Sequence, residues 1–119
     1  MAHILLAEDE PEVRHFVERA LLLDGHHVRG FADGAAALAA LKGGVPAQLL
    51  LTDIKMPVMD GIALALAVAR DWPEMPILLM TGFADQRERA AGLDDLIQEV
   101  LTKPFDLADL QRAVKAALA

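Results

Sequence analysis

Four residue types that carry much of protein chemistry are missing from this chain. Its 119 residues include no cysteine, serine, tyrosine or asparagine. Without cysteine, the chain forms no disulfides and offers no thiol nucleophile. Without serine as well, it lacks the nucleophiles of most acyl-transfer triads. The nucleophiles that remain are carboxylates, three threonines, lysines and histidines.

Basic residues are also in the minority. Eleven Lys and Arg stand against 18 Asp and Glu, which gives a net charge of -7. Proteins bind nucleic-acid phosphates with patches of Lys and Arg, so nucleic acid is not expected as a direct partner. The apolar stretch 61–69 closes at Arg70, well short of the roughly 18 residues that a membrane span needs. Glu8 comes too early for a signal peptide. We therefore expect a cytoplasmic chain that makes no membrane contact.

The pattern of apolar residues indicates the fold class. The length predicts one domain over residues 1–119, and the 55% hydrophobic content is enough for a real core. Longer segments of helical period alternate with five short apolar runs, at 3–7, 28–31, 49–53, 77–80 and 97–102. This regular alternation predicts an α/β fold with a parallel sheet and helices on both faces.

Several helix boundaries can be predicted from single residues. Asp9 is a candidate N-cap for the first helix, with Phe16 on the buried face of that helix. A shorter helix at 85–91 is expected to stop at Gly92. Asp106 is expected to cap the last helix, whose inward-facing residues are Leu107, Leu110, Val114 and Leu118.

The reactive side chains of the chain stand at the ends of the apolar runs. Glu8 and Asp9 follow the first run, Asp53 ends the third, Thr81 follows the fourth and Lys103 follows the fifth. If the runs are neighbouring parallel strands, all five side chains meet at one edge of the sheet. Three crowded carboxylates repel one another and need a cation, and Mg²⁺ suits carboxylate and phosphate oxygens. Together with a lysine and a hydroxyl, this set indicates phosphoryl transfer onto a carboxylate.

These residues, in this order, resemble the receiver domains of bacterial two-component response regulators, which are CheY-like, and the match runs along the whole chain. The stretches that carry it are 8–9, 52–61, 81–82 and 103–105. The resemblance implies a doubly wound, flavodoxin-like sheet of five parallel strands in the order 2-1-3-4-5. It also implies a phosphoacceptor, with self-catalysed phosphotransfer and slow autodephosphorylation, rather than an enzyme in the ordinary sense.

The resemblance gives individual residues a role in the transfer. Asp53 would attack the phosphohistidine of a histidine kinase or a histidine phosphotransferase and form an acyl phosphate. Lys103 would pair with a phosphoryl oxygen, and with Asp53 before phosphorylation. A cis peptide before Pro104 would aim this lysine inward. Thr81 would donate its hydroxyl to the phosphoryl group.

The same resemblance implies a Mg²⁺ site, in which Mn²⁺ can substitute. Asp9 and Asp53 would bind the ion directly, Lys55 through its backbone carbonyl and Glu8 through a water molecule. The stretch 56–61 would shape the turn below Asp53, with Asp60 as the cap of the next helix.

One position departs from the family pattern. Many receivers carry Tyr or Phe three residues before the lysine, as a side chain that moves together with the threonine. This chain has Val100 there, and a β-branched side chain does not swing in the same way. One hypothesis is that Phe83, two residues after Thr81, supplies the mobile aromatic ring. Phe83 and Lys55 also stand where receivers tune the lifetime of the phosphoaspartate.

The output of such a chain is expected to pass through a partner protein, since no output domain is expected after Ala119. The expected surface is formed by the fourth helix, fifth strand and fifth helix, residues 85–91 and 100–117. Local similarity at 49–54, 81–84 and 103–105 resembles the CpdR-type single-domain receivers, which govern substrate delivery to an ATP-dependent protease.

Three other readings stay open at this point. A flavin- or nucleotide-binding module on the same architecture would need a loop rich in hydroxyls and glycine after the first strand, where this chain has Glu8 and Asp9. An aspartyl-phosphate phosphatase would carry its nucleophilic Asp after the first strand, whereas the isolated candidate here is Asp53. A receiver fold could also serve as an interaction module that is never phosphorylated.

Overall fold

The computed structural model describes residues 1–82 and 88–119, and these residues contain one parallel sheet. Its strands are β1 (His3–Ala7), β2 (His27–Phe31), β3 (Leu49–Asp53), β4 (Ile77–Thr81) and β5 (Glu99–Thr102). They pair in parallel in the order β2-β1-β3-β4-β5. The structure therefore confirms the predicted doubly wound α/β fold and its strand order, although β5 begins two residues later than predicted.

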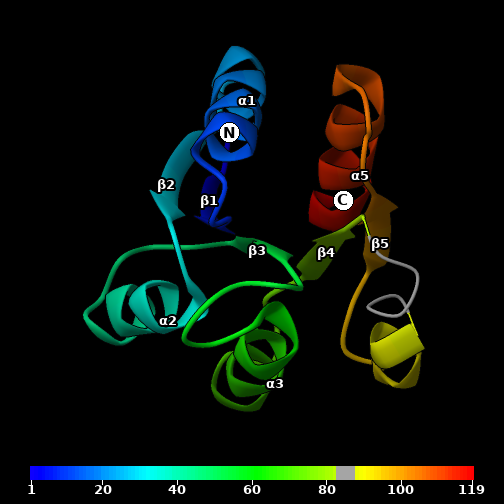
Figure 1. Cartoon of the computed structure of the whole chain (residues 1–119). Coiled ribbons are helices and arrows are strands. Elements are labelled where there is room, and N and C mark those ends of the chain that lie inside the picture. Colours follow the sequence, from blue (N-terminus) through cyan, green and yellow to red (C-terminus); the bar gives the residue numbers. More distant parts are fainter. Residues whose placement is uncertain (83–87) are drawn as a thin grey trace.

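Helices cover both faces of this sheet (Figure 1). They are α1 (Pro11–Leu23), α2 (Gly34–Lys42), α3 (Gly61–Asp71) and α5 (Leu107–Leu118), and residues 88–90 are helical and run into a short 3-10 turn, η1 (Ala91–Leu93). Figure 1 shows α1 and α5 on one face of the sheet, with α2, α3 and residues 88–93 on the other.

The strands supply alternate residues to two hydrophobic cores, because successive side chains of a strand point to opposite faces. In β1, Ile4 and Leu6 pack with α1 and α5, whereas Leu5 and Ala7 pack with α2 and α3. All residues of β3 and β4 are buried, as expected for strands covered on both sides. Each fully buried Leu or Ile stabilises the fold by roughly 2 kcal/mol, so the central strands hold the site rigidly.

The start of α1 differs from the prediction. The N-cap position belongs to Glu10, whose side chain makes no capping hydrogen bond, and not to Asp9. Pro11 occupies the first helical turn, where its fixed φ suits the helix and its missing N–H costs nothing. Phe16 is 43% exposed and lies against Phe105, with the ring centres 6.5 Å apart, instead of entering the core.

The later helix boundaries follow the prediction more closely. The carboxylate of Asp106 accepts a hydrogen bond from the N–H of Asp109 at 2.8 Å and caps α5, which is worth about 1 kcal/mol. Leu107 is 39% exposed and was wrongly predicted to face inward. It is the first residue of the helix, and the buried stripe starts one turn later at Leu110. Gly92 was predicted to end the helix at 85–91. It lies inside the 3-10 turn η1 instead, so helical structure continues past it to Leu93.

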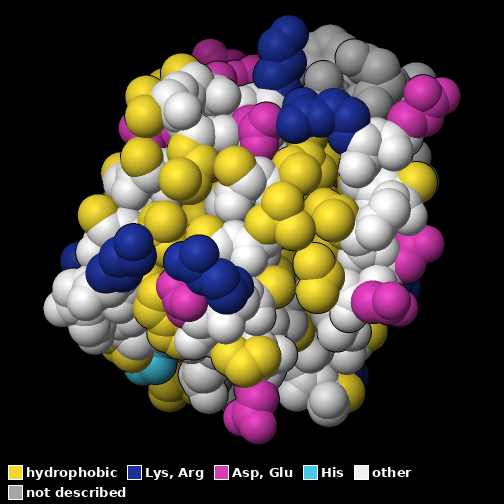
Figure 2. Space-filling model, turned by 90° about the horizontal axis from the view of Figure 1, so that it is seen from below, with side chains coloured by type: hydrophobic (Ala, Val, Ile, Leu, Met, Phe, Trp, Pro, Cys, Tyr) yellow, Lys and Arg dark blue, Asp and Glu magenta, His cyan; other side chains and the backbone are white. Residues whose placement is uncertain are grey.

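The apolar stretch 61–69 forms most of α3. Only one side of that helix is buried, through Gly61, Leu64, Ala65 and Val68. Figure 2 views the molecule from the side of α2 and α3 and shows hydrophobic side chains exposed among charged ones; Leu66 of α3 is 46% exposed. Among the described residues, no helix has the length and apolar character required to cross a membrane.

Candidate functional site

The strand register brings the predicted residues to one edge of the sheet. The last residue pair between β4 and β5 is Thr81 with Thr102. Asp53 ends β3, and Glu8 and Lys103 continue β1 and β5 by one residue. Residues 95 positions apart in the sequence are thereby made neighbours.

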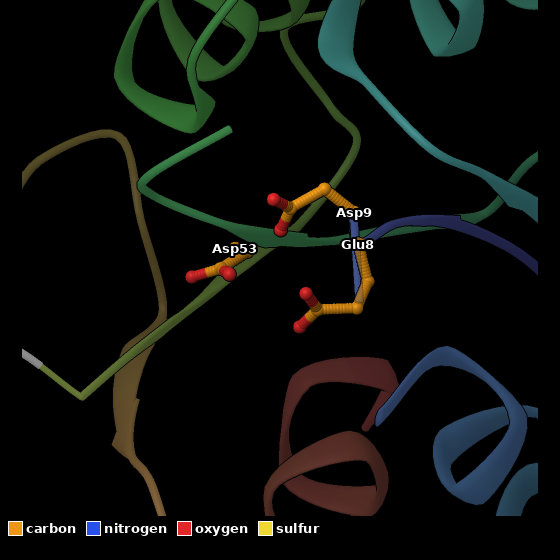
Figure 3. A group of neighbouring side chains, drawn as sticks. All are labelled: Glu8, Asp9 and Asp53. Carbon is orange, nitrogen blue, oxygen red and sulfur yellow. The ribbon is translucent and has the colours of Figure 1, made fainter. Parts of the chain in front are cut away.

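Three carboxylates converge at this edge. Glu8, Asp9 and Asp53 each place a carboxylate oxygen within 4.8 Å of the others, and Figure 3 shows them gathered around a common space beside the ends of β1 and β3. Glu8 is fully buried and Asp53 is 6% exposed, while Asp9 is partly exposed. Buried carboxylates this close repel one another strongly unless a cation lies nearby.

Lys103 provides one such cation. Its Nζ donates hydrogen bonds to Oδ2 of Asp53 at 2.9 Å and to Oε1 of Glu8 at 2.7 Å. The first of these is the predicted pair, whereas the second was not predicted. Burial lowers the pKa of Lys103, but the hydrogen bonds to both carboxylates outweigh it, so its pKa lies above the ordinary value. The peptide bond between Lys103 and Pro104 is cis, as predicted.

Glu8 is the most perturbed acid of the site. Burial raises its pKa, the hydrogen bond from Lys103 lowers it and the charge of Asp53 raises it, which brings the pKa of Glu8 to about 7. Its Oε2 accepts the N–H of Glu10 at 3.1 Å, and its backbone carbonyl accepts Nη1 of Arg14 at 2.7 Å. Glu8 is therefore held in place by α1 and β5, and the site carries a strong demand for positive charge.

Both carboxylate oxygens of Asp53 are hydrogen-bonded. Oδ1 accepts the N–H of Ile54 at 2.8 Å, and Oδ2 accepts Lys103. The carbonyl of Asp53 accepts the hydroxyl of Thr52 at 2.9 Å. It also presses against Gly61, where a Cβ would lie only 1.9 Å from this oxygen. The carboxylate is therefore fixed in one orientation above the first turn of α3.

A hollow opens over this carboxylate. The residues that line it are Asp9, Glu10, Asp53, Lys55, Met56, Pro57, Gly82 and Lys103. Of the other residues predicted for the site, Glu8 and Thr81 are buried, at 0% and 1% exposure, and do not line the hollow. Among the described residues, the heavy atom nearest to a Cβ on Gly82 would be Cβ of Lys103, at 3.7 Å. Asp9, Asp53 and Lys103 give the hollow a charged lining, and charge stabilisation of this kind is what phosphoryl transfer requires.

The loop that follows β3 forms one wall of the hollow. It is closed by the N–H of Gly61, which donates to the carbonyl of Ile54 at 2.8 Å. Asp60 caps α3 as predicted, with Oδ1 accepting the N–H of Ala63 at 2.9 Å. Its Oδ2 accepts Nη2 of Arg89 at 2.6 Å, an ion pair that the sequence did not reveal. Val58 has a φ of 68°, a conformation that β-branched residues rarely adopt.

Of the two positions considered for the aromatic switch, Val100 and Phe83, the structure describes only Val100. Val100 is partly buried and packs with the core beneath α2 and α3. Phe83, the hypothetical substitute for the missing aromatic switch, lies outside the described residues, as do positions 85–87 of the predicted output surface.

The donor set suits a hard divalent cation. Three carboxylates gather oxygen atoms within 4.8 Å, and Lys55 lines the same hollow. Oxygen ligands of this kind, with few protein donors and room for water, are what Mg²⁺ requires. The residues present therefore fit the ion.

Comparison with known proteins identifies the family to which this chain belongs. Residues 4–115 match the response regulator receiver domain. The chain belongs to the response regulator receiver family. It is 42% identical to the response regulator receiver protein CpdR of Brucella abortus, over 99% of this chain and 98% of that protein. It is 37% identical to the transcriptional regulatory protein TcrA of Mycobacterium tuberculosis, of which it spans 44%.

Solved structures of receivers share the fold. The chemotaxis response regulator CheY4 of Vibrio cholerae matches with a TM-score of 0.89 and 28% identity, over 99% of both chains. The response regulator TrrA of Thermotoga maritima, solved in complex with Mg²⁺ and BeF, matches with a TM-score of 0.89 and 26% identity, over 99% of this chain and 100% of that one.

Membership of the family settles the kind of protein. This receiver resembles CpdR, whose length it matches. Receivers are the phosphoacceptor modules of two-component systems rather than enzymes in the ordinary sense, and they interact with histidine kinases or phosphotransferases.

Proposed function

We propose that this receiver takes a phosphoryl group onto Asp53 and signals through a partner that distinguishes the two forms. The observation that carries the proposal is the Asp53 carboxylate itself. It lies at the floor of an acidic hollow, hydrogen-bonded on one oxygen by Ile54 and on the other by Lys103. A fixed, buried carboxylate beside a lysine has no simple structural purpose, because such groups are costly to desolvate.

The transfer is a substitution at phosphorus. An oxygen of Asp53 forms a bond to the phosphorus of a phosphohistidine, the bond between phosphorus and the imidazole nitrogen breaks, and that nitrogen takes up a proton from solvent. Little covalent help is needed, since positioning and charge stabilisation dominate phosphoryl transfer. Lys103 would move its hydrogen bond from Oδ2 of Asp53 to a phosphoryl oxygen, and Thr81 would donate its hydroxyl. The same residues would support slow autodephosphorylation.

Asp9 and Asp53, the backbone carbonyl of Lys55 and, through water, Glu8 would hold Mg²⁺ or Mn²⁺. When bound, the ion neutralises the charge that carboxylates and phosphoryl oxygens share. The convergence of three carboxylates supports this assignment, as does the solved complex of TrrA with Mg²⁺ and BeF.

The output would pass through the surface formed by residues 88–91 and 100–117, together with 85–87, in the cytoplasm. The donor would be a histidine kinase or a histidine phosphotransferase. Likeness to CpdR over nearly the full length of both chains supports a pathway of the CpdR type, with protease delivery machinery as the downstream partner. Phosphorylation would act by shifting a two-state equilibrium that the partner reads.

Intact mass after incubation with acetyl phosphate and Mg²⁺ tests the proposal. The wild-type chain should gain roughly 80 Da, the mass of one phosphoryl group, and a chelator should abolish the gain. Asp53→Ala should gain nothing, whereas Asp71→Ala, which removes a carboxylate at the exposed end of α3, should behave as the wild type. A wild-type chain that stays unmodified with acetyl phosphate and with a competent histidine kinase would instead indicate an interaction module that is not phosphorylated.

A further inference from the structure

The first residue of α2 touches the wall of the site. Gly34 donates its N–H to the carbonyl of Met59 at 3.2 Å. A Cβ on Gly34 would lie 2.6 Å from that carbonyl oxygen and 3.1 Å from Cγ of Met59. Such a contact is too close for any side chain, and the obstacle is backbone, which gives way less easily than a side-chain tip. Gly34 is therefore required by close packing and not by a left-handed backbone.

Met59 belongs to the loop that shapes the hollow. Lys55, Met56 and Pro57, from the first half of this loop, line the hollow beside Asp53. The loop is short and tightly closed, because the N–H of Met59 donates to the carbonyl of Pro57 at 2.8 Å. Met56 is buried and Met59 packs against the core beneath α2. A displacement of Met59 therefore propagates into the residues that face Asp53.

The loop is also under strain, so it needs an external support. Between Pro57 and Met59, Val58 holds a φ of 68° at 85% exposure. A β-branched residue in this region costs about 1–2 kcal/mol, and burial of the Val58 side chain does not repay it. Such strain persists only where the surrounding contacts fix the conformation. The hydrogen bond from Gly34 to the carbonyl of the next residue is one of these contacts.

We propose that Gly34 is a positioning residue for the divalent-cation site. By packing against the Met59 carbonyl, it lets α2 hold the loop 54–60 at the distance that the cation site requires. The inference rests on the proposed function in one respect, namely that Lys55 offers its carbonyl to the ion. It adds that α2, which contributes no residue to the hollow, sets the affinity of the site for Mg²⁺. Residues that orient metal ligands in this way typically change metal affinity by about 10–100-fold when they are altered.

The test is Mg²⁺ binding to the phosphate-free protein, measured by calorimetry. Gly34→Ala should weaken binding by about tenfold. Two controls separate positioning from stability. Asp33→Ala removes the side chain that caps α2 by accepting the N–H of Ala36 at 2.8 Å. It should lower the unfolding temperature yet keep the wild-type affinity. Gly92→Ala adds a methyl group where no atom of the described residues lies within 4 Å, and it should keep the wild-type affinity without lowering the unfolding temperature.

Each outcome decides a different claim. If the wild type binds Mg²⁺ and Gly34→Ala binds it equally well, Gly34 is only a packing residue and the inference is wrong. If Asp33→Ala weakens binding as much as Gly34→Ala, the effect follows from the stability of α2, and the inference is again wrong. If the wild type itself binds no Mg²⁺, the proposed cation site fails instead. Should Gly34→Ala not fold, Met59→Ala is measured in its place, because it keeps Gly34 and removes only the Met59 Cγ that would lie 3.1 Å from a Cβ there. Weaker Mg²⁺ binding by this variant would support the inference, and wild-type affinity would overturn it.

Discussion

Nζ of Lys103 lies 2.7 Å from Oε1 of Glu8, across 95 positions of the chain. This hydrogen bond makes Glu8 part of the charge network around Asp53, in addition to its proposed role beside a water-bound cation. In the metal-free protein, one ammonium group therefore serves two buried carboxylates. The positive charge of Lys103 offsets the negative charges of Glu8 and Asp53, so a change in either partner should change stability. The first two predictions follow from this.

Replacement of Lys103 by Ala should destabilise the metal-free protein. Two buried carboxylates would lose their shared cation, and the side chain of Lys103 is itself only 18% exposed. We expect the free energy of unfolding to fall by about 3 kcal/mol in urea titrations with a chelator present. Mg²⁺ should restore more stability to this variant than to the wild type, because the ion would replace the missing positive charge. Lys115→Ala, at an exposed position of α5, is the control. Equal Mg²⁺ effects on the two variants would contradict the account.

The raised pKa of Glu8 predicts that the stability of the folded protein falls as the pH rises. Its ordinary pKa is 4.5, and in the folded protein the pKa is about 7. The folded state therefore binds this proton more tightly than the unfolded state does. Its contribution to stability is fully present below pH 4.5 and is lost as the pH rises through about 7.

Glu8→Gln isolates that contribution, because it keeps the shape of the side chain and removes its titration. Without metal, the variant should gain stability relative to the wild type between pH 5 and pH 8, by about 1–3 kcal/mol. Urea unfolding at both pH values, with a chelator, measures the difference. A stability difference between the two proteins that is the same at both pH values would show that Glu8 does not titrate in this range.

Gly61→Ala should be among the most damaging small substitutions in the chain. The added Cβ would lie 1.9 Å from the carbonyl oxygen of Asp53, and the backbone fixes the positions of both atoms, so they cannot easily move apart. We expect a loss of more than about 3 kcal/mol, or failure to fold, in thermal denaturation followed by circular dichroism. Gly92→Ala, where no atom of the described residues lies within 4 Å of the added Cβ, should change the free energy of unfolding by less than about 1 kcal/mol. A near-wild-type Gly61→Ala would mean that the end of β3 is looser than the structure shows.

How far the sequence alone leads can be seen at Asp60 and Gly61. The pair was predicted to form a turn and a cap below Asp53, and Asp60 does cap α3. Turn and cap preferences are local, so the printed order of residues is enough to find them. The pressure of Gly61 on the Asp53 carbonyl and the ion pair of Asp60 with Arg89 are contacts between packed elements. No periodicity or motif encodes their distances.

The contrast between local preference and packing also explains why the strands were predicted well and the start of α5 was not. The apolar runs predicted β1 and β3 well, because a strand buried on both faces reads as continuous hydrophobic sequence. The order of the strands came from resemblance to a family and not from the runs themselves. Leu107 was placed inside because it fits the helical period, but it is the first residue of α5 and is 39% exposed. Helix ends depart from a periodic pattern, and only the packed structure shows where the buried stripe begins.

Val58 offers a stabilising substitution. Its φ of 68° disfavours a β-branched side chain, whereas Asn tolerates this region. Since Val58 is 85% exposed, its replacement loses little buried area. Val58→Asn should raise the free energy of unfolding by about 1 kcal/mol. Val58→Thr, which keeps the branched Cβ, is the matched control and should give no gain. If Thr stabilises as much as Asn, backbone strain is not the cause.

The central claim is that Asp53, and no other carboxylate of the cluster, receives the phosphoryl group. Borohydride reduces an acyl phosphate to an alcohol, so treatment of the phosphorylated protein followed by peptide mass spectrometry marks the modified residue. The account predicts homoserine at position 53, with Glu8 and Asp9 unchanged and with no mark at all when Mg²⁺ is removed. A mark on Glu8 or on Asp9 in place of Asp53 would contradict it.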